Sequence, residues 1–199
     1  RLHVDFGCGP GNVLIWSEDW AAERNIQRVG VDVSIRNLQN VLNRTDALVI
    51  LGDATNMPIR DNLASIVSEG SVLHHIHDWK AAIAECCRIS NADAVILLDN
   101  EPSKESLDWS LLARAVFASR FYVYSALSYV LPKYRNFRSI KLAKLNYYQA
   151  EVHNQPGLGF DPDEIMGTFA DGGFRAQVFR RCGAALETGS GANPMQVNI

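Results

Sequence analysis

The stretch VDFGCGPGN, residues 4–12, places a short apolar run directly before a turn that contains three glycines. We expect a strand that ends in this turn and leads into a helix, whose first N–H groups then point into a crevice. Glycine carries no Cβ, so a ligand can approach the backbone of such a turn closely. The stretch therefore predicts a nucleotide-type site, although the same glycines could serve a tight strand-to-helix connection alone.

The spacing of the glycines bears on the kind of nucleotide. The dinucleotide fingerprint reads G-x-G-x-x-G. Here Gly7 and Gly9 are followed by Gly11, and Asn12 stands where the last glycine of that fingerprint would fall. The spacing therefore disfavours NAD.

Two further apolar runs end in an aspartate. Asp32 closes the run in VGVDVS, and Asp53 follows the next run, in LGDATNMP. Ligands of open α/β sheets bind at the carboxyl ends of the strands, where a carboxylate can accept both hydroxyls of a ribose. We expect Asp32 on a ribose and Asp53 beside an adenine ring. Either aspartate alone could be an ordinary cap, but together with the glycine turn they favour one nucleotide-like ligand.

Strand and helix patterns alternate through the first hundred residues. Strands are predicted at 2–6, 28–33, 47–51, 64–68 and 94–99, and helices at 13–25, 34–43 and 79–89. This alternation is typical of the α/β class, with a Rossmann-like, doubly wound and mostly parallel sheet.

The pattern changes after Pro102. Residues 106–148 are apolar, aromatic and basic with helical spacing, interrupted near Pro132, which predicts a helical insertion after the fifth strand. A helix is expected at 161–169. Strands at 176–183 and 195–199, joined by the loop ETGSGANP, predict a seven-stranded sheet that ends in an antiparallel hairpin.

The totals fit a folded protein of one domain, residues 1–199, with a helical cover insertion at about 103–155. Apolar residues make up 47% and charged residues 21% of the 199 residues, which excludes the composition of a disordered chain. A strand-like run follows Arg1 at once and no secretory signal precedes it, so we expect a chain truncated at its N-terminus. The cysteines form no CxxC pair, which disfavours a zinc site or a disulfide framework and fits a reducing, cytoplasmic location: they are Cys8, Cys86, Cys87 and Cys182.

Charge is unevenly distributed along the chain. Between Asp108 and Glu151 there is no acidic residue, although seven basic residues lie there. Such a segment can attract an anionic substrate or an acidic membrane surface, or it can simply be a solvated helix face. The basic residues are Arg114, Arg120, Lys133, Arg135, Arg138, Lys141 and Lys144.

Taken together, these motifs resemble the class I S-adenosylmethionine-dependent methyltransferases, in particular the ubiquinone/menaquinone-biosynthesis-like branch that acts on small molecules. The resemblance covers roughly residues 2–102. VDFGCGPGN is similar to the first motif of that family, VGVDVS to its acidic ribose position, GDATNMP to its adenine loop, and SEGSVLHHIHD (68–78) to the segment after its fourth strand.

The resemblance implies S-adenosyl-L-methionine as cofactor and assigns residues to its parts. Asp5 would lie by the amino group of the methionine moiety, Asp32 on the ribose, Asp53 and Ala54 near adenine, and Glu69 with Gly70 at the sulfonium. The further cofactor contacts that it implies are Gly7, Cys8, Gly9, Gly11, Asn12 and Val33.

Some positions depart from the family pattern. Ser65 stands where the family often has an acidic residue, and the turn before the fifth strand reads Asn91, Ala92, Asp93 instead of Pro-Gly-Gly. An N-terminal helix that commonly helps to close the site is missing from this sequence, which bears on substrate binding rather than on cofactor binding.

Methyl transfer needs little from the protein beyond orientation and, for some acceptors, a base. The histidines after the fourth strand lie next to the expected sulfonium, and imidazole titrates near neutral pH. His75 is our first candidate for a general base, followed by His74 and by Glu101 after the fifth strand. The alternatives are a helix start without proton transfer for the histidines and a solvated loop carboxylate for Glu101. No metal site is expected, because adjacent histidines point apart and no second ligand cluster is seen.

The expected partner is a small-molecule acceptor, which could be aromatic, lipophilic or anionic. The aromatic residues of the insertion could line its pocket or form core contacts: they are Phe117, Phe121, Tyr122, Tyr124, Tyr129 and Tyr134. A nucleic-acid or protein methyltransferase is a second reading, which the absence of an Asn-Pro-Pro-Tyr-like motif disfavours. A cofactor-binding module without catalysis is a third. Peripheral membrane contact is compatible with the basic insertion, and the sequence leaves the oligomeric state open.

Overall fold

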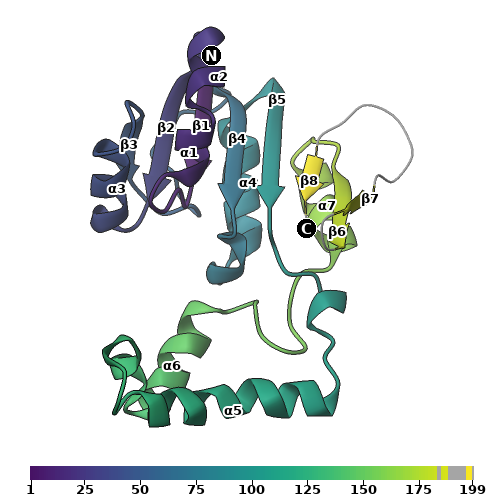
Figure 1. The fold of residues 1–199 in the computed structure, drawn as a ribbon. Helices are drawn as coiled ribbons and strands as arrows, with labels where there is room; N and C mark the ends of the chain where they lie inside the picture. Colours follow the sequence, from purple (N-terminus) through teal and green to yellow (C-terminus); the bar gives the residue numbers. More distant parts are fainter. Residues whose placement is uncertain (183–184, 188–195, 199) are drawn as a thin grey trace. The chain divides into compact units, whose positions relative to one another are not determined.

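The computed structural model describes residues 1–182, 185–187 and 196–198, and the chain divides into two compact units (Figure 1). Unit 1 comprises residues Arg1–Glu101 and Asp161–Ile199, and unit 2 comprises Pro102–Phe160. The segment predicted as a helical insertion lies in unit 2.

Unit 1 contains an α/β sheet of Rossmann-like topology, as the sequence predicts. Its first five strands lie in the order β3-β2-β1-β4-β5, and all neighbouring pairs among them are parallel. The chain thus builds the sheet outward from β1 in one direction and then, from β4, in the other. The strands are β1 (Leu2–Phe6), β2 (Gln27–Asp32), β3 (Leu48–Leu51), β4 (Ala64–Gly70) and β5 (Ser90–Asp99).

Four helices connect these strands, and a short 3-10 turn, η1 (Leu73–His75), follows β4. Polar caps fix two of the helix starts, since the Ser34 hydroxyl accepts a bond from the N–H of Asn37 and the Asp78 carboxylate accepts one from Ala81. The helices are α1 (Asn12–Trp16), α2 (Glu18–Glu23), α3 (Ile35–Leu42) and α4 (Trp79–Ile89).

The predicted helix over 13–25 is interrupted at Ser17. The carbonyl of Leu14 accepts hydrogen bonds from the Ser17 hydroxyl at 3.3 Å and from the buried guanidinium of Arg28. Side chains that bond to a helix carbonyl compete with the regular backbone pattern, so the segment forms two short helices instead of one. Leu14 itself is buried in a cluster with Cys8, Leu38, Val41 and Ala47.

The end of the chain differs from the prediction. The described residues give a sheet of eight strands rather than seven, continued from β5 as β8-β6-β7. β6 (Gln177–Cys182) pairs antiparallel with β7 (Ala185–Glu187), but β8 (Gln196–Asn198) pairs parallel with both β5 and β6. The predicted hairpin of 176–183 with 195–199 is therefore wrong.

The length of the connection accounts for the error. A parallel pair needs a crossover of about a dozen residues, whereas an antiparallel pair needs only a short turn. Thirteen residues separate β6 from β8 in the sequence, which is enough for a parallel pair, whereas the glycines of ETGSGANP suggested a simple turn. Residues 188–194 of that predicted loop lie outside the described residues. Helix α7 (Pro162–Asp171), with Asp161 as its cap, precedes β6 as predicted.

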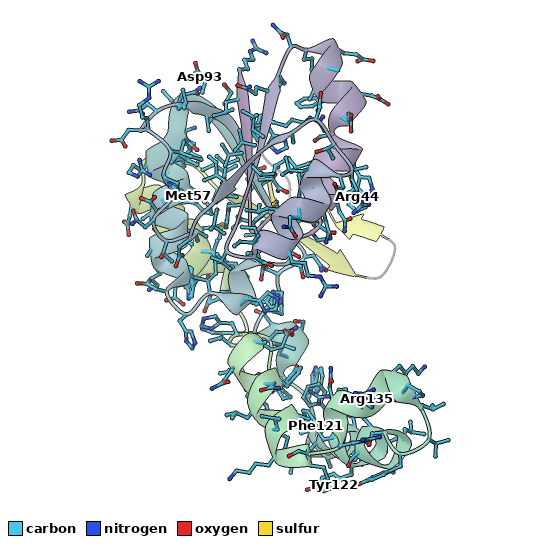
Figure 2. The ribbon with its side chains drawn as sticks, turned by 90° about the vertical axis from the view of Figure 1, so that its left-hand side faces the viewer. Arg44, Met57, Asp93, Phe121, Tyr122 and Arg135 are labelled. Carbon is cyan, nitrogen blue, oxygen red and sulfur yellow. The ribbon has the colours of Figure 1, made fainter. Side chains whose placement is uncertain are left out.

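Unit 2 is helical, with η2 (Glu105–Leu107), α5 (Leu111–Leu127), η3 (Pro132–Phe137) and α6 (Ile140–Ala150). The predicted interruption coincides with η3, which begins at Pro132. Phe121 is buried, whereas the next residue, Tyr122, is exposed (Figure 2). Ring-to-ring contacts hold the inner side of this unit together, and they join Trp109, Phe117, Phe121, Tyr124, Tyr134, Phe137, Tyr147 and Tyr148.

Most of the predicted aromatic residues have a packing role inside unit 2. Four of the six, Phe117, Phe121, Tyr124 and Tyr134, take part in the internal ring contacts of unit 2. The other two, Tyr122 and Tyr129, are exposed. Among the described residues, no helix combines the length and the apolar character that crossing a membrane requires.

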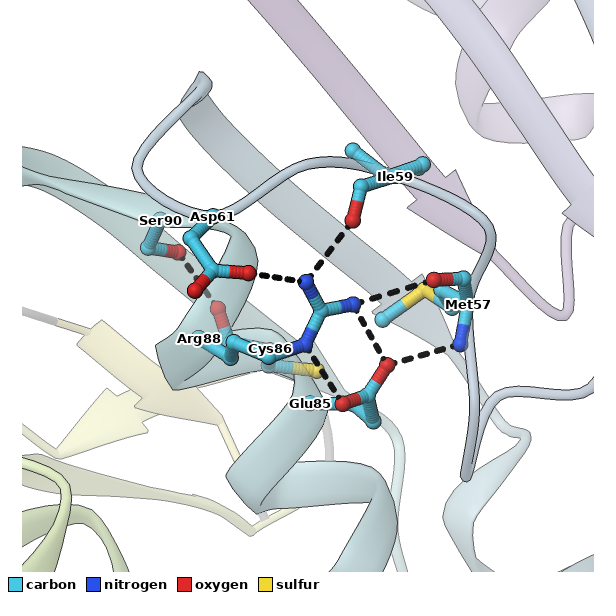
Figure 3. A network of polar contacts seen from close by, with 7 residues as sticks. All are labelled: Met57, Ile59, Asp61, Glu85, Cys86, Arg88 and Ser90. Carbon is cyan, nitrogen blue, oxygen red and sulfur yellow. Dashed lines mark hydrogen bonds and ion pairs between the residues drawn. The ribbon is translucent and has the colours of Figure 1, made fainter.

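One polar network in unit 1 fixes the loop after β3 (Figure 3). The Arg88 guanidinium, on α4, makes two bonds of 2.7 Å to the Glu85 carboxylate and donates to the carbonyls of Ile59 at 2.8 Å and Met57 at 3.0 Å. It also pairs with Asp61 at 2.5 Å, and Glu85 accepts from the N–H of Met57 at 2.7 Å. The Arg88 contact holds the pKa of Glu85 below its usual value. Residues 57–61 are thereby tied to α4.

We expect Arg88→Ala to lower the free energy of unfolding by about 1–3 kcal/mol, because Glu85 and two carbonyls lose their partner. Arg24→Ala is the matched control, since Arg24 forms an exposed pair with Glu23 and should change stability by less than about 0.5 kcal/mol. Urea unfolding followed by circular dichroism measures both. Equal losses in the two variants would contradict a structural role for the network.

Candidate functional site

A cavity of about 760 Å³ lies in unit 1 at the carboxyl ends of β1, β2 and β4. The chain order of the sheet reverses between β1 and β4, and such a switch point is where open α/β sheets bind ligands. Ten of the predicted cofactor residues line the cavity: Asp5, Gly7, Cys8, Gly9, Asn12, Asp32, Val33, Asp53, Ala54 and Gly70. Gly11, Glu69, His74 and Glu101 are not among its lining residues, whereas His75 is.

The glycine turn adopts a backbone that favours glycine. Gly7, Gly9 and Gly11 have φ of 59°, 52° and 86°, a left-handed region that other residues rarely adopt. A Cβ on Gly7 would lie 2.2 Å from Val72, so this glycine allows the loop after β4 to pack on the turn. A Cβ on Gly9 would meet only a carbonyl oxygen at 4.0 Å. Gly9 therefore leaves free space along the cavity wall.

Asp32 fixes the turn to the end of β2. One carboxylate oxygen accepts the N–H of Gly9 at 2.8 Å, and the other accepts the N–H of Ser34 at 2.7 Å. The Asn37 side chain donates to both oxygens at 3.3 and 3.4 Å. Each carboxylate oxygen has two lone-pair sites, and these four contacts occupy all of them, so a ligand hydroxyl would take the place of the long bonds from Asn37.

Asp5 is a buried carboxyl that lines the cavity, and a chain of hydrogen bonds runs behind it. The Ser68 hydroxyl donates to Asp5 at 2.7 Å and lies 2.7 Å from Nε2 of His3. Burial lowers the pKa of His3 to about 4, helped by nearby Arg28, so this ring is neutral. When Asp5 is ionised, the Ser68 hydrogen points toward it, and Nε2 of His3 then donates to the Ser68 oxygen.

Burial raises the pKa of Asp5 to about 7, and the carboxylate of Asp32 adds to the rise, while the bond from Ser68 opposes it. An unpaired buried charge is costly. A cationic ligand group in the cavity would therefore stabilise the ionised form of Asp5. Burial also raises the pKa of the Cys8 thiol to about 12, so Cys8 is no nucleophile at neutral pH.

The loop after β3 supplies another wall. Asp53 is exposed, and one of its oxygens accepts both the N–H and the hydroxyl of Thr55 at 2.8 Å. Asp53, Ala54 and Thr55 all line the cavity, as does the exposed Val33. This part of the cavity offers both a carboxylate and apolar surface.

Glu101 occupies a different place from the one expected of a catalytic base. Its carboxylate is buried and accepts the N–H groups of Val72 and Leu73, both at 2.7 Å, and of His74 at 3.0 Å. It also lies 2.9 Å from Nδ1 of His74, which is itself buried. Both residues thus support the loop after β4 from the protein interior. Because both are buried and neither lines the cavity, the structure does not support their contact with a substrate.

Glu69 is likewise buried rather than aimed into the cavity. One of its oxygens accepts the N–H of Val72 at 3.0 Å. Burial and the neighbouring carboxylate of Glu101 raise the pKa of Glu69 well above its usual value. In its protonated form Glu69 can donate to Glu101, and the two carboxyl groups together anchor the loop that carries His75.

His75 and His77 are exposed and line the cavity on the side of this loop. Of the three catalytic candidates, His75 alone is in a position to meet a ligand there. The cavity also includes residues that sequence reasoning did not name, among them Asn37, Ser71 and Val72. The contact of His3 and Ser68 with Asp5 could not be predicted either. It depends on the register of β1 against β4, which the sequence alone does not give.

Comparisons with known proteins agree with this fold. Residues 4–98 match a family model described as a methyltransferase domain. A protein of Bacillus halodurans, described as a candidate methyltransferase, superposes with a TM-score of 0.55 at 17% identity, over 88% of this chain and 63% of that one. An S-adenosylmethionine-dependent methyltransferase of Thermotoga maritima gives 0.50 at 18% identity, over 87% and 63%.

The chain therefore spans 63% of the length of each of these two structures. At such identities the likeness concerns the fold alone. No curated protein matches the sequence.

We expect Asp5→Asn to stabilise the protein at pH 8. A carboxyl with a pKa of about 7 in the folded state binds its proton more tightly there than in the unfolded chain. Stability therefore falls as pH rises from about 4 to 7, by as much as about 4 kcal/mol. An amide cannot ionise and escapes this loss, while its oxygen can still accept the bond from Ser68.

Thermal unfolding at pH 4 and pH 8 measures the difference, with the exposed Asp93→Asn as control. The gain should appear at pH 8 and vanish at pH 4 for Asp5→Asn, and should be absent at both for Asp93→Asn. A loss of stability at pH 8 would refute the assigned cost of the buried carboxylate.

Proposed function

We propose that this protein is an S-adenosylmethionine-dependent methyltransferase that acts on a small-molecule acceptor, as the resemblance to the ubiquinone/menaquinone-biosynthesis-like branch suggests. The observation that carries the proposal is the meeting of Asp5, Asp32 and Asp53 with the glycine turn in one cavity at the switch point of the sheet. The family match over residues 4–98 supports it.

The residues present fit such a cofactor. Asp5 offers a buried carboxyl for the ammonium group of the methionine part, and Gly9 leaves space along its backbone. Asp32 can accept ribose hydroxyls in place of its long bonds from Asn37, while Asp53, Ala54 and the exposed Val33 suit the adenine end. The volume of about 760 Å³ lies within the range of small-molecule sites.

Bound S-adenosylmethionine supplies a methyl group on a sulfonium, open to in-line displacement by a nucleophilic atom. The task of the chain is to orient this group, to exclude water and to hold a proton where the acceptor must lose one. His75 is the residue proposed for the last role, because it lines the cavity from the loop after β4. Gly70 and Ser71 line the same side.

The proposal predicts that the protein binds S-adenosylmethionine and that Gly9→Ala weakens binding at least about tenfold, because the added methyl group projects into the cavity. Gly173→Ala is the matched control. Gly173 also has a positive φ, of 84°, has no atom within 4 Å of an added Cβ, and lies after α7 outside the cavity lining. Both variants pay a similar backbone cost of about 1 kcal/mol.

Isothermal titration calorimetry measures the affinities. No binding by the wild type, or equal losses in the two variants, would contradict the proposed cofactor site. If the cofactor binds, methyl transfer to a panel of quinols, phenols and sugars separates an enzyme from a binding module, which would transfer nothing to any acceptor.

A second prediction concerns pH. Because the ammonium group of the cofactor favours ionised Asp5, affinity should rise about tenfold between pH 5.5 and 7, with release of up to one proton. Calorimetry in buffers of different ionisation enthalpy counts the protons. Ser68→Ala removes a donor to ionised Asp5 and should move the whole profile to higher pH. A uniform loss of affinity at every pH would instead mean that Ser68 has only a packing role.

A further inference from the structure

The chain from the end of β4 to the start of α4, which we call segment 70–78, forms one wall of the cavity. Gly70, Ser71, Val72 and residues 75–78 line the space. Val72 also packs against the glycine turn, since a Cβ on Gly7 would lie 2.2 Å from its side chain. The conformation of this segment therefore determines where His75 lies and bears on the position of the glycine turn.

The backbone next to this wall is strained at two points. Ser71 and Asn100 have φ of 64° and 62°, a left-handed region that residues with a Cβ rarely adopt. The Asn100 side chain donates to the Ser71 hydroxyl at 3.1 Å. Such conformations persist only where the surrounding structure enforces them. Val72 follows Ser71 and Glu101 follows Asn100, so the contact between Val72 and Glu101 lies where this strain has to be held.

Glu101 accepts three consecutive N–H groups of the segment. Its Oε1 accepts those of Val72 and Leu73, both at 2.7 Å. Its Oε2 accepts that of His74 at 3.0 Å and lies 2.9 Å from Nδ1 of the same residue. Each oxygen thus has two contacts, and a proton on either oxygen would take the place of one of them. The contacts therefore require Glu101 in its ionised form.

Glu69 meets the same N–H group with less support. Its Oε2 accepts the N–H of Val72 at 3.0 Å, so oxygens of the two carboxyl groups lie close together. Its Oε1 is buried and has no hydrogen-bond partner within the described part of the chain. Burial raises the pKa of Glu69 well above its usual value, and the carboxylates of Glu101 and Asp5 add to the rise. Two buried carboxyl groups at this spacing do not both ionise, and the proton goes to the one with fewer donors.

We propose that Glu101 is a positioning residue of the methyl-transfer site, which holds segment 70–78 in place as an anion while Glu69 keeps the one proton of the pair. The link to methyl transfer rests on the proposed function. Glu101 does not line the cavity and acts through the backbone of Val72 and Leu73. A wall that is already ordered spares the cofactor the cost of ordering it on binding.

Hydrogen exchange followed by mass spectrometry tests this support without any cofactor. The amides of segment 70–78 should exchange at least about tenfold faster in Glu101→Gln, because a neutral amide has only one oxygen to accept the three N–H groups. Glu69→Gln keeps a donor toward Glu101 in place of the proton, so it should raise this exchange by no more than about twofold. Ser90→Ala controls for a general loss of stability. It removes a buried bond of 2.7 Å to the carbonyl of Cys86 at the opposite end of β5 and should leave exchange in the segment unchanged.

A charge-retaining variant covers the case in which Glu101→Gln does not fold, which circular dichroism reveals. Glu101→Asp keeps the carboxylate on a side chain one carbon shorter, so its exchange in segment 70–78 should lie between those of the wild type and Glu101→Gln. Exchange as slow as in the wild type would show that the reach of Glu101 is immaterial and would overturn the proposal.

Infrared spectroscopy locates the proton, which a merely structural role would not fix on one residue. Glutamate labelled with ¹³C at the side-chain carboxyl separates the glutamates from the unlabelled Asp5. At pH 7 the wild type should show a label-sensitive C=O stretch of a protonated carboxyl, and Glu69→Gln should lack it. Absence of the band from the wild type, or its persistence in Glu69→Gln, would contradict the assigned proton.

Calorimetry with S-adenosylmethionine connects the support to the site. Affinity should fall at least about tenfold in Glu101→Gln, by less than about threefold in Glu69→Gln, and not measurably in Ser90→Ala. Equal losses in the two glutamine variants, or a Glu101→Gln variant that binds like the wild type, would refute the positioning role alone. A wild type that binds no cofactor would refute the proposed function and the positioning role together.

Discussion

The bond between Asp32 and the N–H of Gly9 is the contact on which the cavity depends. The turn contains Gly7, Gly9 and Gly11, all with positive φ, and glycine restricts the backbone too little to fix one conformation by itself. The Asp32 carboxylate ties this turn to the end of β2 and, through Ser34 and Asn37, to the start of α3. One side chain thus sets the relative positions of two strand ends and a helix start. The buried position of Asp32 keeps water from competing for these bonds.

Local patterns in the sequence were sufficient to predict those parts of unit 1 that depend on residues close together in the chain. Apolar runs, glycines and strand-end aspartates lie within a few residues of one another, and the structure brings Gly9, Asp32 and Asp53 to one cavity as expected. Glu101 and His74 could not be placed in this way. Their position depends on a long-range contact between the end of β5 and the loop after β4, which no spacing in the sequence reveals.

The same distinction explains the other differences. The break at Ser17 arises because Arg28, on the next strand, bonds to a helix carbonyl, and helical periodicity carries no information on that contact. The pairing of β8 consists of long-range contacts with β5 and β6, which the alternation of β8 itself does not reveal. Composition, in contrast, identified the helical insertion, because its aromatic and basic character changes abruptly after Pro102.

The two ends of unit 2 are joined by backbone hydrogen bonds. Lys104 donates to the carbonyl of Phe160 at 2.9 Å, and Phe160 donates to that of Pro102 at 2.8 Å. The chain therefore leaves unit 1 and re-enters it at neighbouring points. A segment with such ends can be lengthened, shortened or replaced in the course of evolution without altering the connectivity of the strands. Such changes could not extend to Glu101, because this residue, just before the insertion, supports the loop after β4.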